Sequence, residues 1–206
     1  MQIRRLILAS TSPFRRELLR AAGMYFEPCA PTCDERQITA ATARELALAR
    51  ARGKSASVEA ENALVLGADQ VLGFEDRALD KVSSRDEATA RLRALAGKAH
   101  TLETAYALSV GGQVIVERVE TATMRMRPLR DDEISAYLDS GEWEGSVGCY
   151  QYENRGGQLF EPGSPEMSLI VGLPIAYLSR DLRALGVDLL VNPDGPWDLT
   201  LDSAQG

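Results

Sequence analysis

The sequence predicts an α/β fold with a mixed central sheet flanked by helices. Short apolar runs that suit buried strands alternate with segments whose apolar residues recur at helical spacing. Gly111-Gly112 joins two long strand-like runs, which is typical of a two-residue hairpin and inserts an antiparallel pair into this alternation. The length of 206 residues, with 45% hydrophobic and 26% charged residues, suits a soluble globular domain.

The first strand and helix are predicted within residues 2–22. Residues 2–9 form a short apolar run suited to a buried strand. Ser12 supplies an N-cap oxygen, and Pro13 fits the first helical position because its fixed φ suits a helix. Gly23 then favours the end of the helix.

The remaining elements follow the same alternation. We expect strands at residues 24–29, 63–68, 101–110 and 113–126, and helices at residues 42–56, 85–95, 131–138 and 174–185. Loops are expected at residues 30–39 and in the glycine-rich segment 141–157. Residues 187–206 contain four aspartates and no lysine or arginine. We therefore predict one domain at residues 1–186 and a mobile acidic tail at residues 187–206.

The charge distribution limits the classes of partner. The net charge is −7, which argues against binding to nucleic-acid polymers or anionic membranes. Residues 1–20 nevertheless hold five arginines and one glutamate, so an anion could be bound locally. No apolar run has the length of a signal or membrane segment, and three cysteines with one histidine fit neither a disulfide framework nor a zinc site. We expect a cytoplasmic protein.

The first candidate site is the start of the first helix. Helix N-termini carry unpaired N–H groups and partial positive charge, so Arg15 and Arg16 in the first turn lack an electrostatic partner. A phosphate held by the hydroxyls of Ser10, Thr11 and Ser12 and by the two guanidiniums would supply that partner. A capped helix with solvated arginines is an equally good interpretation of these residues alone.

Further polar residues follow predicted strands or lie in loops. Asp69 comes directly after the apolar run at residues 63–68, where a carboxylate could hold Mg²⁺ or orient a water molecule. An aspartate that ends a strand in a turn is the commoner interpretation. Three other groups are Asp34-Glu35, Asp80-Lys81 and residues 148–153. Each of these is by itself more typical of a solvated surface or a half-buried strand.

Taken in order, these segments resemble the Maf family of nucleotide pyrophosphatases. Residues 6–19 are similar to the opening signature of that family. The later matching segments are residues 34–35, 67–70, 81, 95–101, 148–153 and 171–174. The resemblance runs from residue 3 to about residue 186, so almost only the acidic tail lies outside it.

The resemblance implies an enzyme with a two-lobed, Maf/ITPase-like fold. Such an enzyme hydrolyses nucleoside triphosphates to the monophosphate and pyrophosphate in a cleft, with Mg²⁺ or Mn²⁺ as cofactor. Four residues would bind the phosphates: Ser10, Ser12, Arg15 and Arg16. Asp69 would activate water and, with Glu35, hold the metal, and Lys81 would complete the catalytic set by neutralising phosphate charge. Gln70 and Glu153 would lie near the base or the metal.

The sequence departs from the family pattern at two places. The family commonly has Gly-Lys-Pro around its lysine, whereas this chain has Asp80 and Val82 on either side. A family lysine on the second helix corresponds to Arg52, with Lys54 close by. Because arginine and lysine bind phosphates differently, the residue that makes this contact stays open.

The resemblance also bears on substrate and partners. Gln70 and Glu153 are more similar to the branch associated with 7-methyl-GTP than to the dTTP and UTP branch, and a carboxylate would favour a cationic methylated purine. Members of the family suggest a homodimer. The alternative function is a non-catalytic regulator of cell division that senses nucleotides. Because Glu35, Asp69, Lys81 and Glu153 are all present, the enzyme is the favoured prediction.

Overall fold

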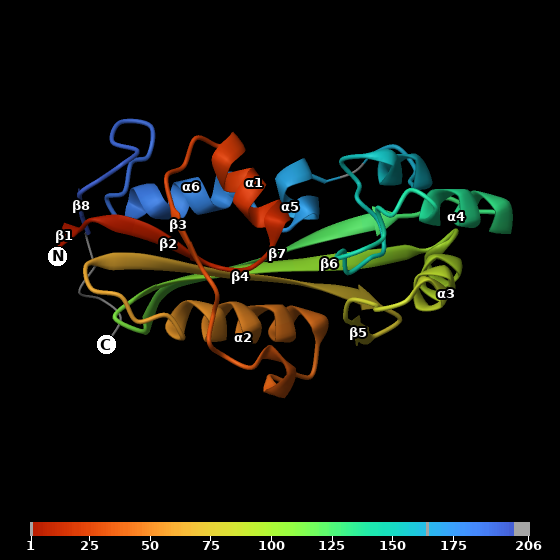
Figure 1. Ribbon diagram of the computed structural model, residues 1–206, viewed down its shortest axis with the longest axis horizontal. Coiled ribbons are helices and arrows are strands. Elements are labelled where there is room, and N and C mark those ends of the chain that lie inside the picture. Colours follow the sequence, from red (N-terminus) through yellow and green to blue (C-terminus); the bar gives the residue numbers. More distant parts are fainter. Residues whose placement is uncertain (1, 164, 200–206) are drawn as a thin grey trace.

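The computed structural model describes residues 2–163 and 165–199, and within them six strands form one mixed sheet (Figure 1). The order across the sheet is β3 (Glu27–Cys29), β2 (Arg5–Ala9), β4 (Ala63–Phe74), β6 (Ala99–Val110) and β7 (Gln113–Arg125), with β5 (Arg77–Leu79) paired to β4. Strand β2 is parallel to β3 and β4, whereas the other pairs are antiparallel. The predicted mixed α/β sheet is confirmed.

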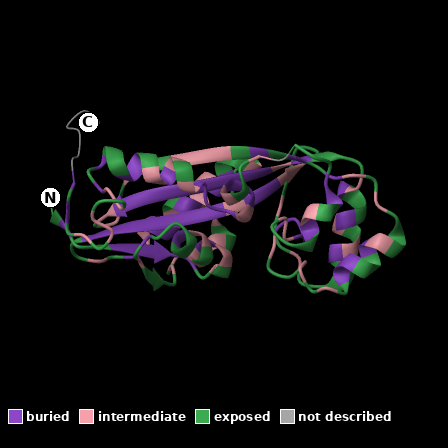
Figure 2. Ribbon diagram, turned by 90° about the horizontal axis from the view of Figure 1, so that it is seen from above, coloured by how far each residue is buried: buried purple, intermediate pink, exposed green. Residues whose placement is uncertain are grey.

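Helices cover both faces of the sheet and build a second lobe at one end. Helix α2 (Ala43–Ala56) lies on one face, and α1 (Pro13–Ala21), α5 (Met167–Val171) and α6 (Ile175–Ala184) lie on the other (Figure 1). The far end carries α3 (Arg85–Leu95), α4 (Asp131–Leu138) and the short 3₁₀ helix η2 (Arg155–Leu159). Figure 2 shows this end as a separate lobe beside the main body of the sheet.

Side-chain caps fix where the main helices begin. Ser12 accepts a hydrogen bond from the backbone N–H of Arg15, as predicted for the start of α1. Thr42 and Ser84 begin α2 and α3 with reciprocal capping boxes. These caps satisfy N–H groups that would otherwise lack partners.

Each lobe buries an apolar cluster of its own. The cluster of the sheet body includes Leu6, Leu8, Leu19, Leu178 and Leu182. The cluster of the second lobe includes Leu92, Leu95, Ile134, Tyr150 and Phe160. Because each lobe is packed internally, the space between them can be lined by polar side chains.

Strand β4 is longer than the sequence predicts. It continues past residue 68 to Phe74, because its second half pairs with β6 and, at its end, with β5. Asp69 therefore lies within a strand and does not end one, so that prediction was wrong. The parallel neighbour β2 does end early, since Ala9 pairs with Gly67. Asp69 consequently lies just beyond the carboxyl end of β2, where ligands bind in α/β sheets.

The start of the predicted tail packs against the N-terminus. Strand β8 (Trp197–Asp198) pairs with β1 (Gln2–Ile3), and Val187, Trp197 and Leu199 are buried. We expected a mobile tail over these residues. The structure differs because Val187, Trp197 and Leu199 pack against the main core cluster. Residues 200–206 lie outside the described residues.

Close packing of α2 on β4 depends on Gly67. A Cβ atom at this position would lie 2.4 Å from the carbonyl oxygen of Ala51 and 2.4 Å from the amide nitrogen of Ser55. We expect Gly67→Ala to lower the free energy of unfolding by about 3 kcal/mol, because backbone atoms of α2 must move. Urea denaturation measures this loss. A variant with an unchanged midpoint would contradict the close approach.

His100 makes the stability of the second lobe depend on pH. Its side chain is 3% exposed, its Nε2 lies 2.7 Å from the Tyr150 hydroxyl, and burial lowers the pKa of His100 to about 4. The unfolded chain therefore takes up a proton near the ordinary pKa of about 6.5 while the folded chain does not. The resulting stabilisation is complete above that pH and is lost as the pH falls toward 4.

We expect this histidine to contribute about 2 kcal/mol of pH-dependent stability between pH 6.5 and 5. The measurement is the free energy of unfolding in urea across this range, compared with His100→Gln. The variant lacks the titrating group, so its stability should fall less steeply with acid. Parallel curves for the two proteins would show that the histidine does not carry the effect.

Candidate active site

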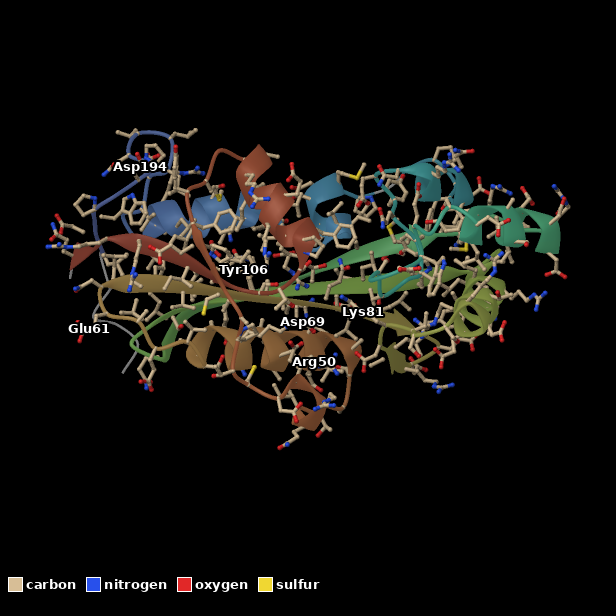
Figure 3. All side chains as sticks on the ribbon, viewed as in Figure 1. Arg50, Glu61, Asp69, Lys81, Tyr106 and Asp194 are labelled. Atoms are coloured by element: carbon tan, nitrogen blue, oxygen red, sulfur yellow. The ribbon has the colours of Figure 1, made fainter. Side chains whose placement is uncertain are left out.

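A cleft of about 910 Å³ is lined by residues of both lobes. The main body supplies the loop after β2, the start of α1, the side of α2 and the middle of β4. The second lobe supplies residues 144–148 and 150–153. Figure 3 shows Asp69, Arg50 and Lys81 close to one another beside the sheet. The structure thus brings most of the predicted site residues into one cavity.

A buried lysine holds two carboxylates at the floor of the cleft. Lys54 Nζ lies 2.7 Å from Asp69 Oδ1 and 2.8 Å from Glu35 Oε2, and it donates to the carbonyl oxygen of Ala68 at 3.2 Å. The lysine is 4% exposed. Since a buried ammonium needs charged partners, this triad fixes Asp69 and the short 3₁₀ helix η1 (Glu35–Gln37) against α2.

The second oxygen of Asp69 is available for chemistry. Oδ2 is buried and has no hydrogen-bond partner among the described residues. Arg50 Nη1 lies 3.8 Å from this oxygen, beyond hydrogen-bond distance. A buried carboxylate oxygen without a donor is costly, so the site favours a ligand such as water or a cation there.

The start of α1 forms the anion-binding end of the cleft. Arg15 is buried, its Nε donates to the carbonyl oxygen of Gly172 at 3.0 Å, and its Nη1 lies 3.4 Å from Ser10 Oγ. Burial lowers the pKa of Arg15, although Asp69 and Glu35 oppose this shift. Its guanidinium remains charged because arginine does not deprotonate in proteins.

Arg16 differs from the other predicted phosphate ligands. Ser10, Ser12 and Arg15 line the cleft, whereas Arg16 is not among its lining residues. The Arg16 side chain turns back along the loop, so that Nη2 donates to the carbonyl oxygen of Ser10 at 3.5 Å. In this conformation Arg16 stabilises the loop between β2 and α1 and does not line the cleft.

Lys81 extends into the cleft from the loop between β5 and α3. Although the side chain is solvent-exposed, the cleft walls remove enough water to lower the pKa of Lys81, and Arg15 lowers it further. The preceding residue, Asp80, makes two hydrogen bonds with Arg50, at 2.6 and 3.2 Å. This pair ties the loop of Lys81 to α2.

Gln70 lines the cleft from β4, and Glu153 lines it from the second lobe. Gln70 Nε2 donates to Thr104 Oγ1 at 2.8 Å and to the carbonyl oxygens of Leu169 and Ile170 at 3.1 and 3.0 Å. Its amide is therefore used to join β4 to α5. Glu153 is exposed, and partial desolvation raises the pKa of its carboxyl.

The structure decides which basic residue of α2 enters the site. Lys54 lies in it, whereas Arg52 is exposed and forms an ion pair with Glu117. Arg50 also lines the cleft and was missed from the sequence. The spacing could have found it, because residues four apart lie on the same face of a helix and residue 52 points away from that face.

The residues present fit a divalent cation that is shared with a substrate. Among the described residues no cluster of three or more His, Cys, Asp or Glu side chains could hold a metal alone. Two carboxylates, Asp69 and Glu35, do converge, and Asp69 Oδ2 lacks a donor. Mg²⁺ commonly binds through one or two carboxylates together with water and substrate phosphates, so the donor set is sufficient.

Comparison with known proteins shows the family of this chain. The family described as Maf-like protein matches residues 5–185. The chain belongs to the Maf family. A dTTP/UTP pyrophosphatase of Hyphomonas neptunium is 40% identical over 182 residues, which cover 88% of this chain and 95% of that protein. A 7-methyl-GTP pyrophosphatase of Rhizobium etli is 40% identical over 192 residues, covering 88% and 96%.

These Maf relatives carry different named activities at equal identity, so identity alone does not assign a base. Among solved structures, a HAM1 protein from Coxiella burnetii is 18% identical with a TM-score of 0.47, covering 86% of this chain and 98% of that chain. That likeness is too weak to argue from. Over the described residues, no helix is both long and apolar enough for a membrane crossing.

Proposed function

We propose that this Maf protein hydrolyses nucleoside triphosphates to the monophosphate and pyrophosphate, with a divalent cation. The observation that carries the proposal is Asp69 Oδ2, a buried carboxylate oxygen without a donor on the floor of a cleft lined with cationic side chains. Arg15, Arg50, Lys54 and Lys81 face the three carboxylates of Glu35, Asp69 and Asp80. The lining also includes Arg36, Asp34, Glu144 and Glu153, so six acidic side chains stand against five basic ones. A polyphosphate would therefore bind at the basic side chains together with a divalent cation.

Asp69 would be the proton acceptor in this reaction. A water molecule at Asp69 Oδ2 loses a proton to the carboxylate as its oxygen bonds to the α-phosphorus. The bond from that phosphorus to the bridging oxygen of the β-phosphate breaks, and pyrophosphate leaves. Lys54 holds Asp69 through Oδ1 and so keeps Oδ2 directed to the water.

The remaining residues stabilise the phosphates. Arg15, Lys81 and the hydroxyls of Ser10 and Ser12 would take the negative charge that grows in the transition state. When bound at Asp69 and Glu35, Mg²⁺ or Mn²⁺ would neutralise phosphate charge and polarise the phosphorus–oxygen bond. Arg16 would stabilise the loop between β2 and α1 through the carbonyl oxygen of Ser10, in place of the direct phosphate contact that we predicted.

The substrates include modified purines such as 7-methyl-GTP in this proposal. Glu153 supplies a carboxylate on the cleft wall, which would attract the positive charge of a 7-methylated base. Gln70 would act by fixing the cleft wall, because its amide already bonds to Thr104 and α5. We also propose a cytoplasmic location and a homodimer. Light scattering of the purified protein tests the homodimer.

The deciding experiment is an assay of the purified protein with Mg²⁺ or Mn²⁺. The panel contains dTTP, UTP, GTP and 7-methyl-GTP, and the products measured are pyrophosphate and the nucleoside monophosphate. We expect equal amounts of both products with at least one substrate. Binding of a nucleotide without any product would instead support the regulator that senses nucleotides.

A further inference from the structure

Arg50 lies between two carboxylates and is bonded to only one of them. Its Nη1 and Nη2 both donate to Asp80, at 2.6 and 3.2 Å. Its distance from Nη1 to Asp69 Oδ2 is 3.8 Å, about 1 Å longer than a charge-assisted hydrogen bond. The side chain of Arg50 is 12% exposed, so few water molecules compete for it.

Arg50 could pair with Asp69 after a small movement. Asp69 Oδ2 is buried without a donor, while Oδ1 is already bonded to Lys54. If the guanidinium of Arg50 were released from Asp80, a shift of about 1 Å would therefore let it donate a hydrogen bond to Asp69 Oδ2. In that position it would cover the oxygen that the proposed reaction requires.

Asp80 is well placed to prevent this shift. Its two hydrogen bonds to Arg50 match the planar fork of a guanidinium, which is the strongest geometry for such a pair. The pairing raises the pKa of Arg50 and lowers the pKa of Asp80, so both groups stay charged. The backbone of Asp80 is fixed in turn, because its carbonyl oxygen accepts from Arg91 Nη2 at 3.1 Å.

We propose that Asp80 is a positioning residue that holds Arg50 away from Asp69 and thereby leaves Asp69 Oδ2 open to water or a divalent cation. The inference rests on the proposed function for its effect on turnover. It assigns a role to Asp80, which precedes Lys81 and acts through Arg50. The same contact also ties the loop of Lys81 to α2.

The test compares Asp80→Ala, Arg50→Leu and the double variant with the wild type. We expect Asp80→Ala to lower kcat and to weaken binding of Mn²⁺ by about tenfold each, since one charge-assisted hydrogen bond is added to Asp69. In the double variant Arg50 can no longer reach Asp69, so the affinity for Mn²⁺ should return to within about threefold of wild type. Arg50→Leu alone should leave the affinity of the nucleotide-free protein for Mn²⁺ within the same range, because Asp69 Oδ2 stays open.

Mn²⁺ binding is measured by electron paramagnetic resonance on nucleotide-free protein, so this part does not depend on turnover. The matched control is Asp131→Ala, which removes an exposed aspartate–arginine pair outside the cleft and should change neither quantity. A merely structural loss at Asp80 would not be repaired by deleting a second charge.

Two results would overturn the inference. One is an Asp80→Ala variant with wild-type kcat and Mn²⁺ affinity, and the other is a double variant whose Mn²⁺ affinity is no higher than that of Asp80→Ala. If the wild type hydrolyses none of the triphosphates, the proposed function fails separately. Recovery of Mn²⁺ affinity in the double variant would still support the pairing.

Discussion

Asp69→Asn should reduce kcat by about 10³-fold or more while leaving the protein folded. Asparagine has nearly the same shape, but it cannot accept the proton of water and it carries no charge for a cation. Glu35 remains bonded to Lys54, so the ammonium keeps one anionic partner. KM for the triphosphate should change much less, because the proposed function assigns phosphate binding mainly to Ser10, Arg15 and Lys81.

The measurement is steady-state release of pyrophosphate, accompanied by urea denaturation to show that the variant is folded. Asp131→Asn serves as the control, since Asp131 is an exposed aspartate of α4 outside the cleft. If Asp69→Asn kept its kcat, Asp69 would not be the proton acceptor and the proposed mechanism would fail.

Lys54→Met should lower kcat by about 10²-fold and the free energy of unfolding by about 3 kcal/mol. Methionine fills a similar volume without the charge, so Asp69 and Glu35 lose their shared partner and repel each other. Asp69 accounts for more of the lost free energy of unfolding than Glu35 does. The Asp69 side chain is 10% exposed, whereas the Glu35 side chain is 39% exposed. A buried carboxylate without a cation is the costlier of the two.

Arg52→Met is the matched control for this prediction. It lies two residues away on the same helix and forms an ion pair with Glu117, with side chains 49% and 36% exposed. We expect a loss below about 1 kcal/mol and no change in kcat, because exposed pairs contribute little. Equal losses for the two variants would show that burial of Lys54 does not matter.

The sequence predicted the starts and turns of elements better than it predicted where a strand ends. The capped start of α1 and the hairpin at Gly111-Gly112 follow from local rules, and both are confirmed. The end of β4 was wrong because pairing with β6 and β5 prolongs the strand, and no local signal reports a neighbouring strand. Boundaries of this kind depend on contacts between distant residues.

The sequence by itself determined the family resemblance, the alternation of strands and helices, and the local excess of arginine near a helix start. These are properties of residue order, capping and charge, which act over a few positions. Only the tertiary structure decided that Lys54 and not Arg52 holds Asp69, and that Asp80 binds Arg50. Packing of α2 against β4 sets both choices, because the face that a helix presents to a sheet selects which charges become buried.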